Sequence, residues 1–119
     1  MKKTLVIGAS LKPIRYSNIA INRLTESGHP VVAIGLREGE VAGVEIIKER
    51  KFFKNVDTVT LYLNASRQKD FYDYIISLKP KRVIFNPGTE NLAFYKILDE
   101  NNISYEAACT LVLLSTGQY

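Results

Sequence analysis

The sequence has few of the residue types that build disulfide scaffolds, metal centres or histidine-based catalytic sites. It contains one cysteine and one histidine among 119 residues, so no internal disulfide and no cluster of zinc ligands can form. No nucleophile with a partner histidine is recognisable either. We therefore expect no metal site and no catalytic residues, and this favours a binding module over an enzyme.

Long apolar runs are missing as well. The basic start, Met1-Lys2-Lys3, is followed by an apolar stretch that ends at Gly8, too soon for the h-region of a signal peptide. No stretch approaches the length of a transmembrane helix. The net charge of +4 is spread along the chain, and no nucleic-acid-binding motif is visible. We expect a cytoplasmic protein that binds neither membranes nor nucleic acid.

The sequence does contain short apolar runs that alternate with amphipathic segments. The expected strands are residues 4–7, 31–34, 58–63, 82–85 and 103–106, and the expected helices are residues 18–27, 66–78 and 91–101. Residues 35–43 are expected to form a loop, and residues 44–53 a short extended piece followed by a turn of helix. The carboxylates, Asp70 among them, fall in helices or before strands, as is typical of solvated surface.

This alternation predicts an α/β fold: a Rossmann-like three-layer α/β/α sandwich with a five-stranded parallel sheet, in one domain over residues 1–119. The preference for right-handed crossovers favours the strand order 3-2-1-4-5. Such sheets bind ligands beyond the carboxyl ends of their strands, beside strand one. The loops after the five predicted strands are therefore the candidates for a site.

The loop after the first predicted strand, Gly8-Ala9-Ser10 and the residues that follow, is suited to phosphate. Gly8 lets the chain turn sharply and lets a ligand approach the backbone. The start of the next helix offers unpaired N–H groups and a positive dipole end. Ser10 adds a hydroxyl, and Lys12 and Arg15 add positive charge. The alternative is an ordinary strand-to-helix turn with a capping serine, but such a turn does not need two cations.

The glycine pattern of dinucleotide-binding folds, G-x-G-x-x-G, is absent, because neither Ser10 nor Pro13 is glycine. The acidic residue that grips the ribose of NAD after strand two is not in its place either. That strand runs into Leu36-Arg37, and a basic end suits a phosphorylated adenosine ribose, as in coenzyme A or NADP. The alternative is that Arg37 is a solvated loop charge.

Several short motifs occur one after another along the chain. They are Val6-Ile7-Gly8-Ala9-Ser10, Lys12-Pro13, Tyr16-Ser17-Asn18, Gly28-His29, Gly43, Val56-Asp57, Asn86-Pro87-Gly88, Asn91 and Cys109. In these motifs the chain resembles the small stand-alone CoA-binding domain proteins, relatives of the N-terminal CoA-binding domain of the succinyl-CoA synthetase alpha subunit. The likeness extends from about residue 4 to residue 115.

The resemblance implies a ligand, coenzyme A, and a set of contacts. The residues that it places along the phosphates are Gly8, Ser10, Lys12 and Arg15, with Asn18 starting the helix below. It also implies that Leu36 and Arg37 lie near the adenosine. Relatives usually have Asn-Pro-Arg after strand two, and of that motif this chain keeps only the arginine.

Two later loops have both a structural and a ligand-binding interpretation. Asn64 could bond a ligand, although Ser66 as a helix cap explains that segment without one. Pro87-Gly88 favours a tight turn with Thr89 capping the next helix, or its backbone lines the channel for the pantetheine arm of coenzyme A. Both interpretations stay open at each loop.

Three functions follow from these patterns. The leading hypothesis is non-catalytic binding of coenzyme A or an acyl-CoA. The second is a CoA-binding component of a multi-chain acyl-CoA synthetase, whose catalytic residues would lie on another polypeptide. The third is a redox or nucleotide sensor that uses NAD(P) and Cys109, against which stands the alternative of a buried, inert cysteine. A homodimer or another protein partner is possible, with the apolar residues 111–114 as one candidate contact.

Overall fold

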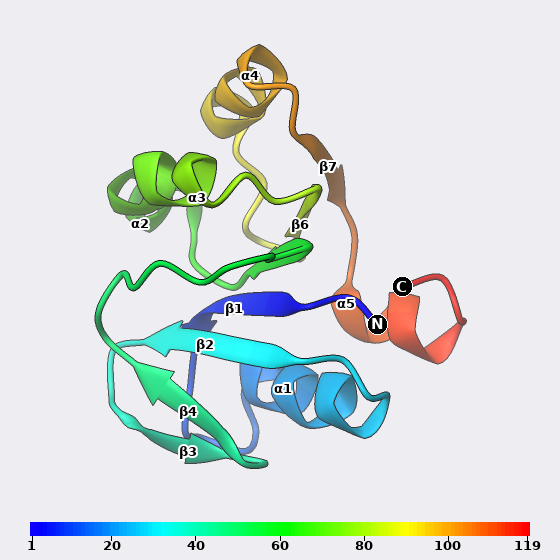
Figure 1. Ribbon diagram of the computed structural model, residues 1–119. Helices are drawn as coiled ribbons and strands as arrows, with labels where there is room; N and C mark the ends of the chain where they lie inside the picture. The colour runs from blue at the N-terminus through cyan, green and yellow to red at the C-terminus, as the bar shows by residue number, and fades with distance from the viewer.

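Seven strands form one sheet in the computed structural model, which describes residues 1–119, and helices cover both faces of this sheet (Figure 1). The strands are β1 (Thr4–Ala9), β2 (Val31–Gly35), β3 (Gly39–Val41), β4 (Val44–Ile47), β5 (Thr58–Leu61), β6 (Arg82–Phe85) and β7 (Ser104–Ala107). The helices are α1 (Tyr16–Glu26), α2 (Ala65–Gln68), the 3-10 turn η1 (Lys69–Phe71), α3 (Tyr72–Leu78), α4 (Leu92–Glu100) and α5 (Thr110–Ser115). The expected α/β class and Rossmann-like architecture are confirmed.

The expected five-stranded sheet with the order 3-2-1-4-5 is wrong. The observed order is β3-β4-β2-β1-β5-β6-β7, with β3 antiparallel to β4 and all other neighbours parallel. The difference comes from β4, because this short strand takes the place beside β2 that was expected for residues 58–63. β5 consequently pairs with the other side of β1. When β4 is counted as the third strand, the six parallel strands have the Rossmann order 3-2-1-4-5-6.

The helices lie close to the expected ones, with two differences. Residues 66–78 do not form one helix, because the segment is divided into α2, η1 and α3. The C-terminal apolar residues form an additional short helix, α5, which packs beside α1. No helix combines the length and the apolar character needed to cross a bilayer.

The two faces of the sheet bury different kinds of side chain. The face under α3 and α4 has the larger apolar core, in which the Phe85 and Phe94 rings pack edge to face with their centres 5.8 Å apart. The face under α1 and α5 is partly polar. There Asn86 Nδ2 donates to Thr60 Oγ1 over 2.7 Å, and Asn86 Oδ1 accepts from the Thr110 N–H over 2.9 Å. These buried polar groups are satisfied, so they fix the start of α5 against the sheet.

The connection from β4 to β5 contains no helix. Residues 48–57 instead run in an extended path across the face of the sheet that α3 and α4 also cover (Figure 1). Phe53 packs against the larger core, and the Tyr74 hydroxyl donates to the Lys51 carbonyl. Parallel strands are usually joined through a helix. The extended path brings Lys48 and Arg50 to the carboxyl edge of the sheet.

Candidate functional site

β1 ends in a bulge that turns the chain over the carboxyl edge of the sheet. Gly8 has a φ of +92°, and the register between β1 and β2 shifts between Ile7 and Ala9. A Cβ at Gly8 would lie 3.0 Å from the carbonyl carbon of Tyr62, and a Cβ at Gly35 would lie 2.3 Å from the Ala9 oxygen. Only glycine fits both positions, and the backbone of these two strand ends remains accessible.

A cleft of about 740 Å³ lies at this edge, where the parallel strands end. The loop after β1 contributes Gly8, Ala9, Ser10, Leu11, Lys12, Arg15, Tyr16 and Ser17. The ends of β2 and β4 contribute Ile34, Gly35, Leu36, Arg37, Lys48 and Arg50. The segments after β5 and β6 contribute Tyr62, Leu63, Arg67, Asp70, Phe71, Pro87 and Thr89. The cleft therefore lies beside β1, where the strand order reverses and such folds bind their ligands.

Most of the residues that the sequence predicted for the site do line this cleft. They are Gly8, Ala9, Ser10, Lys12, Arg15, Leu36, Arg37 and Pro87. Three others, Asn18, Asn64 and Gly88, lie outside its lining. The Gly88 N–H donates to Glu90 Oε1 over 2.8 Å, so this glycine serves the turn after β6.

Asn18 holds the cleft loop from behind. It is buried, and its Nδ2 donates to the Ser10 carbonyl over 2.9 Å. Asn22 Nδ2 donates in turn to the Asn18 carbonyl over 3.0 Å. The implied role at the start of the helix is wrong, because α1 already begins at Tyr16. Asn18 fixes the path of the loop that lines the cleft.

Asn64 is a helix cap. Its Oδ1 accepts from the Arg67 N–H over 3.1 Å and from Ser66 Oγ over 2.8 Å. The structural interpretation of this segment is thus correct, although Asn64 and not Ser66 is the capping residue. After β6 the cap is likewise Asn91 rather than Thr89, whose hydroxyl donates to the Asn86 carbonyl over 2.7 Å.

The start of α1 has no side-chain cap. The N-cap residue is Arg15, and no side chain accepts a hydrogen bond from the first turn. The next two residues, Tyr16 and Ser17, both line the cleft. Their N–H groups have no partner within the helix, and the positive end of the helix dipole lies at the same place. No serine caps α1, although Ser10 Oγ accepts from the Lys12 N–H over 3.1 Å within the loop. The helix start is therefore open to an anion.

Positive charge dominates the cleft. Its lining contains one carboxylate, Asp70, and six cations: Lys12, Arg15, Arg37, Lys48, Arg50 and Arg67. All six are exposed, and none donates a side-chain hydrogen bond or forms an ion pair with the protein. Like charges in one concave site attract anions. Because these cations have no charged partner within the protein, a bound anion accounts for their position best.

Four of the charged lining residues were not identified from the sequence. Lys48 and Arg50 follow β4, a strand that the sequence analysis did not assign, so no sheet edge was predicted for them. Arg67 and Asp70 fall in a segment expected to be a solvated helix surface. A usable signal was present after β4, where cations follow directly on the apolar Ile46-Ile47.

The wall of the cleft on the side of β5 and β6 is fixed by a buried amide. Gln68 is fully buried, and its Nε2 donates to the Leu63 carbonyl over 2.9 Å and to the Thr89 carbonyl over 2.7 Å. Its Oε1 accepts from Asn91 Nδ2 over 2.9 Å. Because Leu63 and Thr89 both line the cleft, Gln68 sets the spacing of the two loops that form this wall.

Neither Tyr62 nor Cys109 supplies a reactive group to the cleft. Burial raises the pKa of Tyr62 to about 12, so its hydroxyl stays neutral at physiological pH. Cys109 is half-buried at the start of α5 and does not line the cleft. A thiol in this position would not touch a ligand bound in the cleft.

Comparison with known proteins gives a family and several structural relatives. A family model for the CoA binding domain matches residues 2–115. A crystal structure of an uncharacterized protein is 52% identical, with a TM-score of 0.97 over 100% of this chain and 98% of that one. A hypothetical protein from Pyrococcus horikoshii is 25% identical, with a TM-score of 0.87 over 97% of this chain and 82% of that one. No curated protein matches the chain.

A third structure, from Thermus thermophilus, is 23% identical, with a TM-score of 0.87 over 99% of this chain and 90% of that one. At this identity the likeness shows the fold alone. The fold is therefore shared nearly end to end with small proteins of similar length.

Proposed function

This chain belongs to the CoA binding domain family, and from that premise we propose that its cleft binds coenzyme A or an acyl-CoA without catalysing its chemistry. The observation that carries the proposal is the set of six unpaired cations beside an uncapped helix start. Coenzyme A bears a diphosphate and a separate phosphate on the adenosine ribose, joined to an uncharged pantetheine arm. Its charge matches the excess of cations in the cleft.

Different groups of lining residues suit the different chemical parts of coenzyme A. Ser10, Lys12, Arg15 and the open N–H groups of α1 suit the diphosphate. Gly8 also lines the cleft, and a Cβ there would lie 3.0 Å from the carbonyl carbon of Tyr62, so glycine permits the close approach of the two strand ends that form this part of the site. Leu36 and Arg37 would lie beside the adenosine, since they follow β2, the neighbouring strand.

The remaining wall suits the pantetheine arm. Leu63, Pro87 and Thr89 contribute apolar surface and backbone groups, and the two charged residues of this wall, Arg67 and Asp70, have opposite signs. Gln68 holds Leu63 and Thr89 at a fixed distance. The pantetheine arm is uncharged and has amide groups, so it suits a wall of apolar surface and backbone groups. A phosphate group would instead need an excess of cations in this wall.

Binding without catalysis is supported by the chemistry of the lining. The ionisable groups there are the six cations, Asp70 and tyrosines. The single histidine, His29, precedes β2 at the opposite edge, where it accepts a hydrogen bond from the Lys2 N–H over 3.1 Å. A role as the CoA-binding component of a multi-chain acyl-CoA synthetase stays a prediction, as does the cytoplasmic location.

Titration calorimetry tests the proposal. We expect the purified chain to bind coenzyme A more tightly than NAD⁺, NADP⁺ or ATP at the same ionic strength. Mass spectrometry under native conditions should also detect a bound molecule of coenzyme A after incubation. Binding of NADP⁺ with no binding of coenzyme A would replace the proposal with the nucleotide-sensor hypothesis, and no binding of either would leave it without support.

A further inference from the structure

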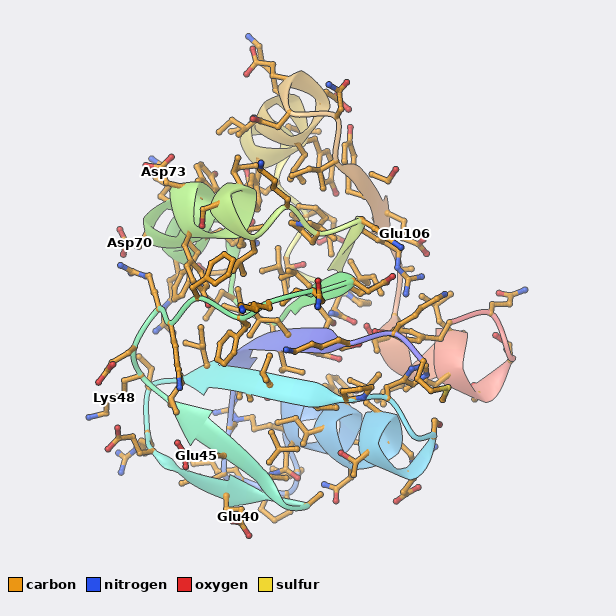
Figure 2. All side chains as sticks on the ribbon, viewed as in Figure 1. Glu40, Glu45, Lys48, Asp70, Asp73 and Glu106 are labelled. Atoms are coloured by element: carbon orange, nitrogen blue, oxygen red, sulfur yellow. The ribbon has the colours of Figure 1, made fainter.

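Lys48 and Arg50 line the cleft beyond the end of β4, and the Arg50 side chain reaches Phe71 in η1. They follow β4, which is separated from β1 by β2, so the ends of β4 and β1 lie about 10 Å apart. Figure 2 shows Lys48 and Asp70 at the same edge of the molecule, the edge toward which β2 and β4 point. Five of the six cations of the cleft thus form two groups, one at the start of α1 (Lys12 and Arg15) and one at the ends of β2 and β4 (Arg37, Lys48 and Arg50). The sixth, Arg67, lies in α2, after β5.

Resting on the proposed function, we propose that Lys48 and Arg50 form with Arg37 a second anion subsite. Its ligand is the 3′-phosphate of the adenosine ribose, so the subsite makes the cleft select coenzyme A over dephospho-coenzyme A. The first group of cations meets the diphosphate that both compounds carry. The second group meets the one phosphate by which they differ.

The orientation of Arg50 supports this assignment. Its guanidinium carbon lies 4.6 Å from the centre of the Phe71 ring, and both side chains line the cleft. A cation–π contact at this distance does not use the guanidinium N–H groups as hydrogen-bond donors to protein oxygens. No protein group accepts from these N–H groups, and their planar fork suits two oxygens of one phosphate.

The segment that carries both cations is held in place before any ligand arrives. Phe53 anchors it in the larger core, the Tyr74 hydroxyl donates to the Lys51 carbonyl, and Lys3 Nζ donates to the Lys54 carbonyl over 2.8 Å. A fixed backbone spares part of the entropy that ordering a loop on binding would cost.

The acidic groups near this end do not cancel its charge. Asp70 is exposed and forms no ion pair with any cation of the cleft. Glu38 and Glu49, the sequence neighbours of Arg37, Lys48 and Arg50, do not contribute to the lining. Three cations therefore face one carboxylate, which leaves an excess that one phosphate can neutralise.

The test is a comparison of two ligands and three proteins by calorimetry. Coenzyme A and dephospho-coenzyme A are titrated into the unmodified chain, into the double variant Lys48→Met/Arg50→Met, and into the control Lys51→Met/Lys54→Met. Methionine keeps the apolar contact with Phe71 and removes the charge. The control removes two cations from the same segment that do not line the cleft.

We expect the unmodified chain and the control to bind coenzyme A roughly 10- to 100-fold more tightly than dephospho-coenzyme A, as hydrogen bonds to a charged group allow. In the Lys48→Met/Arg50→Met variant this ratio should fall at least about fivefold, through weaker binding of coenzyme A alone, and Arg37 accounts for any selectivity that is left. Thermal unfolding of each protein checks that the variants are folded, and Lys48→Met by itself should give an intermediate ratio.

Two results would overturn the subsite and leave the proposed function intact. One is equal binding of both compounds by the unmodified chain, and the other is an unchanged ratio in the double variant. Absence of binding of both compounds to the unmodified chain is a separate outcome, because it refutes the proposed function itself.

Discussion

Basic side chains at the two edges of the sheet are used in opposite ways. At the amino edge, Lys3 Nζ donates to the Lys54 carbonyl over 2.8 Å and Arg82 Nε donates to Thr58 Oγ1 over 3.2 Å. The Arg82 guanidinium also lies 4.6 Å from the centre of the Tyr119 ring. At the carboxyl edge, the six cations of the cleft make no such hydrogen bonds, and the one aromatic contact among them joins Arg50 to Phe71.

This difference separates charges that serve the fold from charges that serve a ligand. A cation with a protein partner contributes to stability through that partner. Cations without hydrogen-bond or ion-pair partners repel one another, and this repulsion opposes folding. Substitutions of the cleft cations at the carboxyl edge should therefore change binding without lowering stability, and substitutions of the hydrogen-bonded cations at the amino edge should do the reverse.

The largest effect is expected for the charges around α1. The double variant Lys12→Met/Arg15→Met should weaken coenzyme A binding by roughly 1000-fold, about 4 kcal/mol, because two charge-assisted contacts are lost. Its melting temperature should stay the same or rise slightly. Calorimetry and thermal unfolding measure the two quantities, and Arg23→Met, an exposed cation elsewhere on α1, is the matched control. A lower melting temperature in the double variant would contradict the comparison.

A second substitution sharpens the comparison, because Gln68 lies at the carboxyl edge and yet serves the fold. Gln68→Leu leaves the Leu63 and Thr89 carbonyls and the Asn91 amide short of partners in a buried site. We expect a loss of about 3 kcal/mol in the free energy of unfolding, measured by urea denaturation. The exposed neighbour Lys69→Leu should change it by less than about 0.5 kcal/mol. Equal stability of the two variants would mean that the buried amide does not brace the wall.

The smallest effect is expected for Arg82 at the amino edge. Arg82→Met removes the hydrogen bond to Thr58 and the contact with the Tyr119 ring, and should cost about 2 kcal/mol of stability. The ion pair with Glu106, at 3.9 Å, adds little because Glu106 is partly solvated. Coenzyme A binding should stay within about twofold of the unmodified chain. A large change in affinity would contradict the assignment of the amino-edge cations to stability and of the carboxyl-edge cations to ligand binding.

The loop after β1 could be predicted because its determinants are contiguous. Gly8, Ser10, Lys12 and Arg15 follow an unmistakable apolar strand, so local sequence fixes both the turn and the edge at which it lies. The same loop lacks the glycine pattern typical of NAD-binding sites, and this absence is also visible in the sequence.

The part of the cleft lined by Lys48 and Arg50 could not be predicted, because it depends on β4, a strand whose apolar pattern in the sequence is weak. β4 has four residues, and one of them is the exposed Glu45, so its pattern is not that of a buried strand. Without β4, the strand order places residues 58–63 wrongly and leaves Lys48 and Arg50 without a location. Tertiary pairing with β2 decides this strand, and pairing over that distance in sequence leaves no local signal.

Gln68 was missed for a different reason. A glutamine in an amphipathic helix is normally solvated, and only the meeting of two loops around its side chain explains its burial. Asn18 is similar, since its partner Ser10 lies in the loop that it supports. Residues that position a site act through contacts that the sequence does not reveal.

The helix-free path from β4 to β5 also bears on how the cleft moves. None of the N–H groups of residues 48–56 donates a hydrogen bond to the backbone, so side chains alone hold this segment. In hydrogen exchange these amides should be among the least protected of the interior connections. The segment that carries Lys48 and Arg50 is thus a part of the cleft wall whose position depends on side-chain anchors. A ligand bound there would add contacts to a segment that is already in position, and recognition of charge would be registered as slower exchange of these amides.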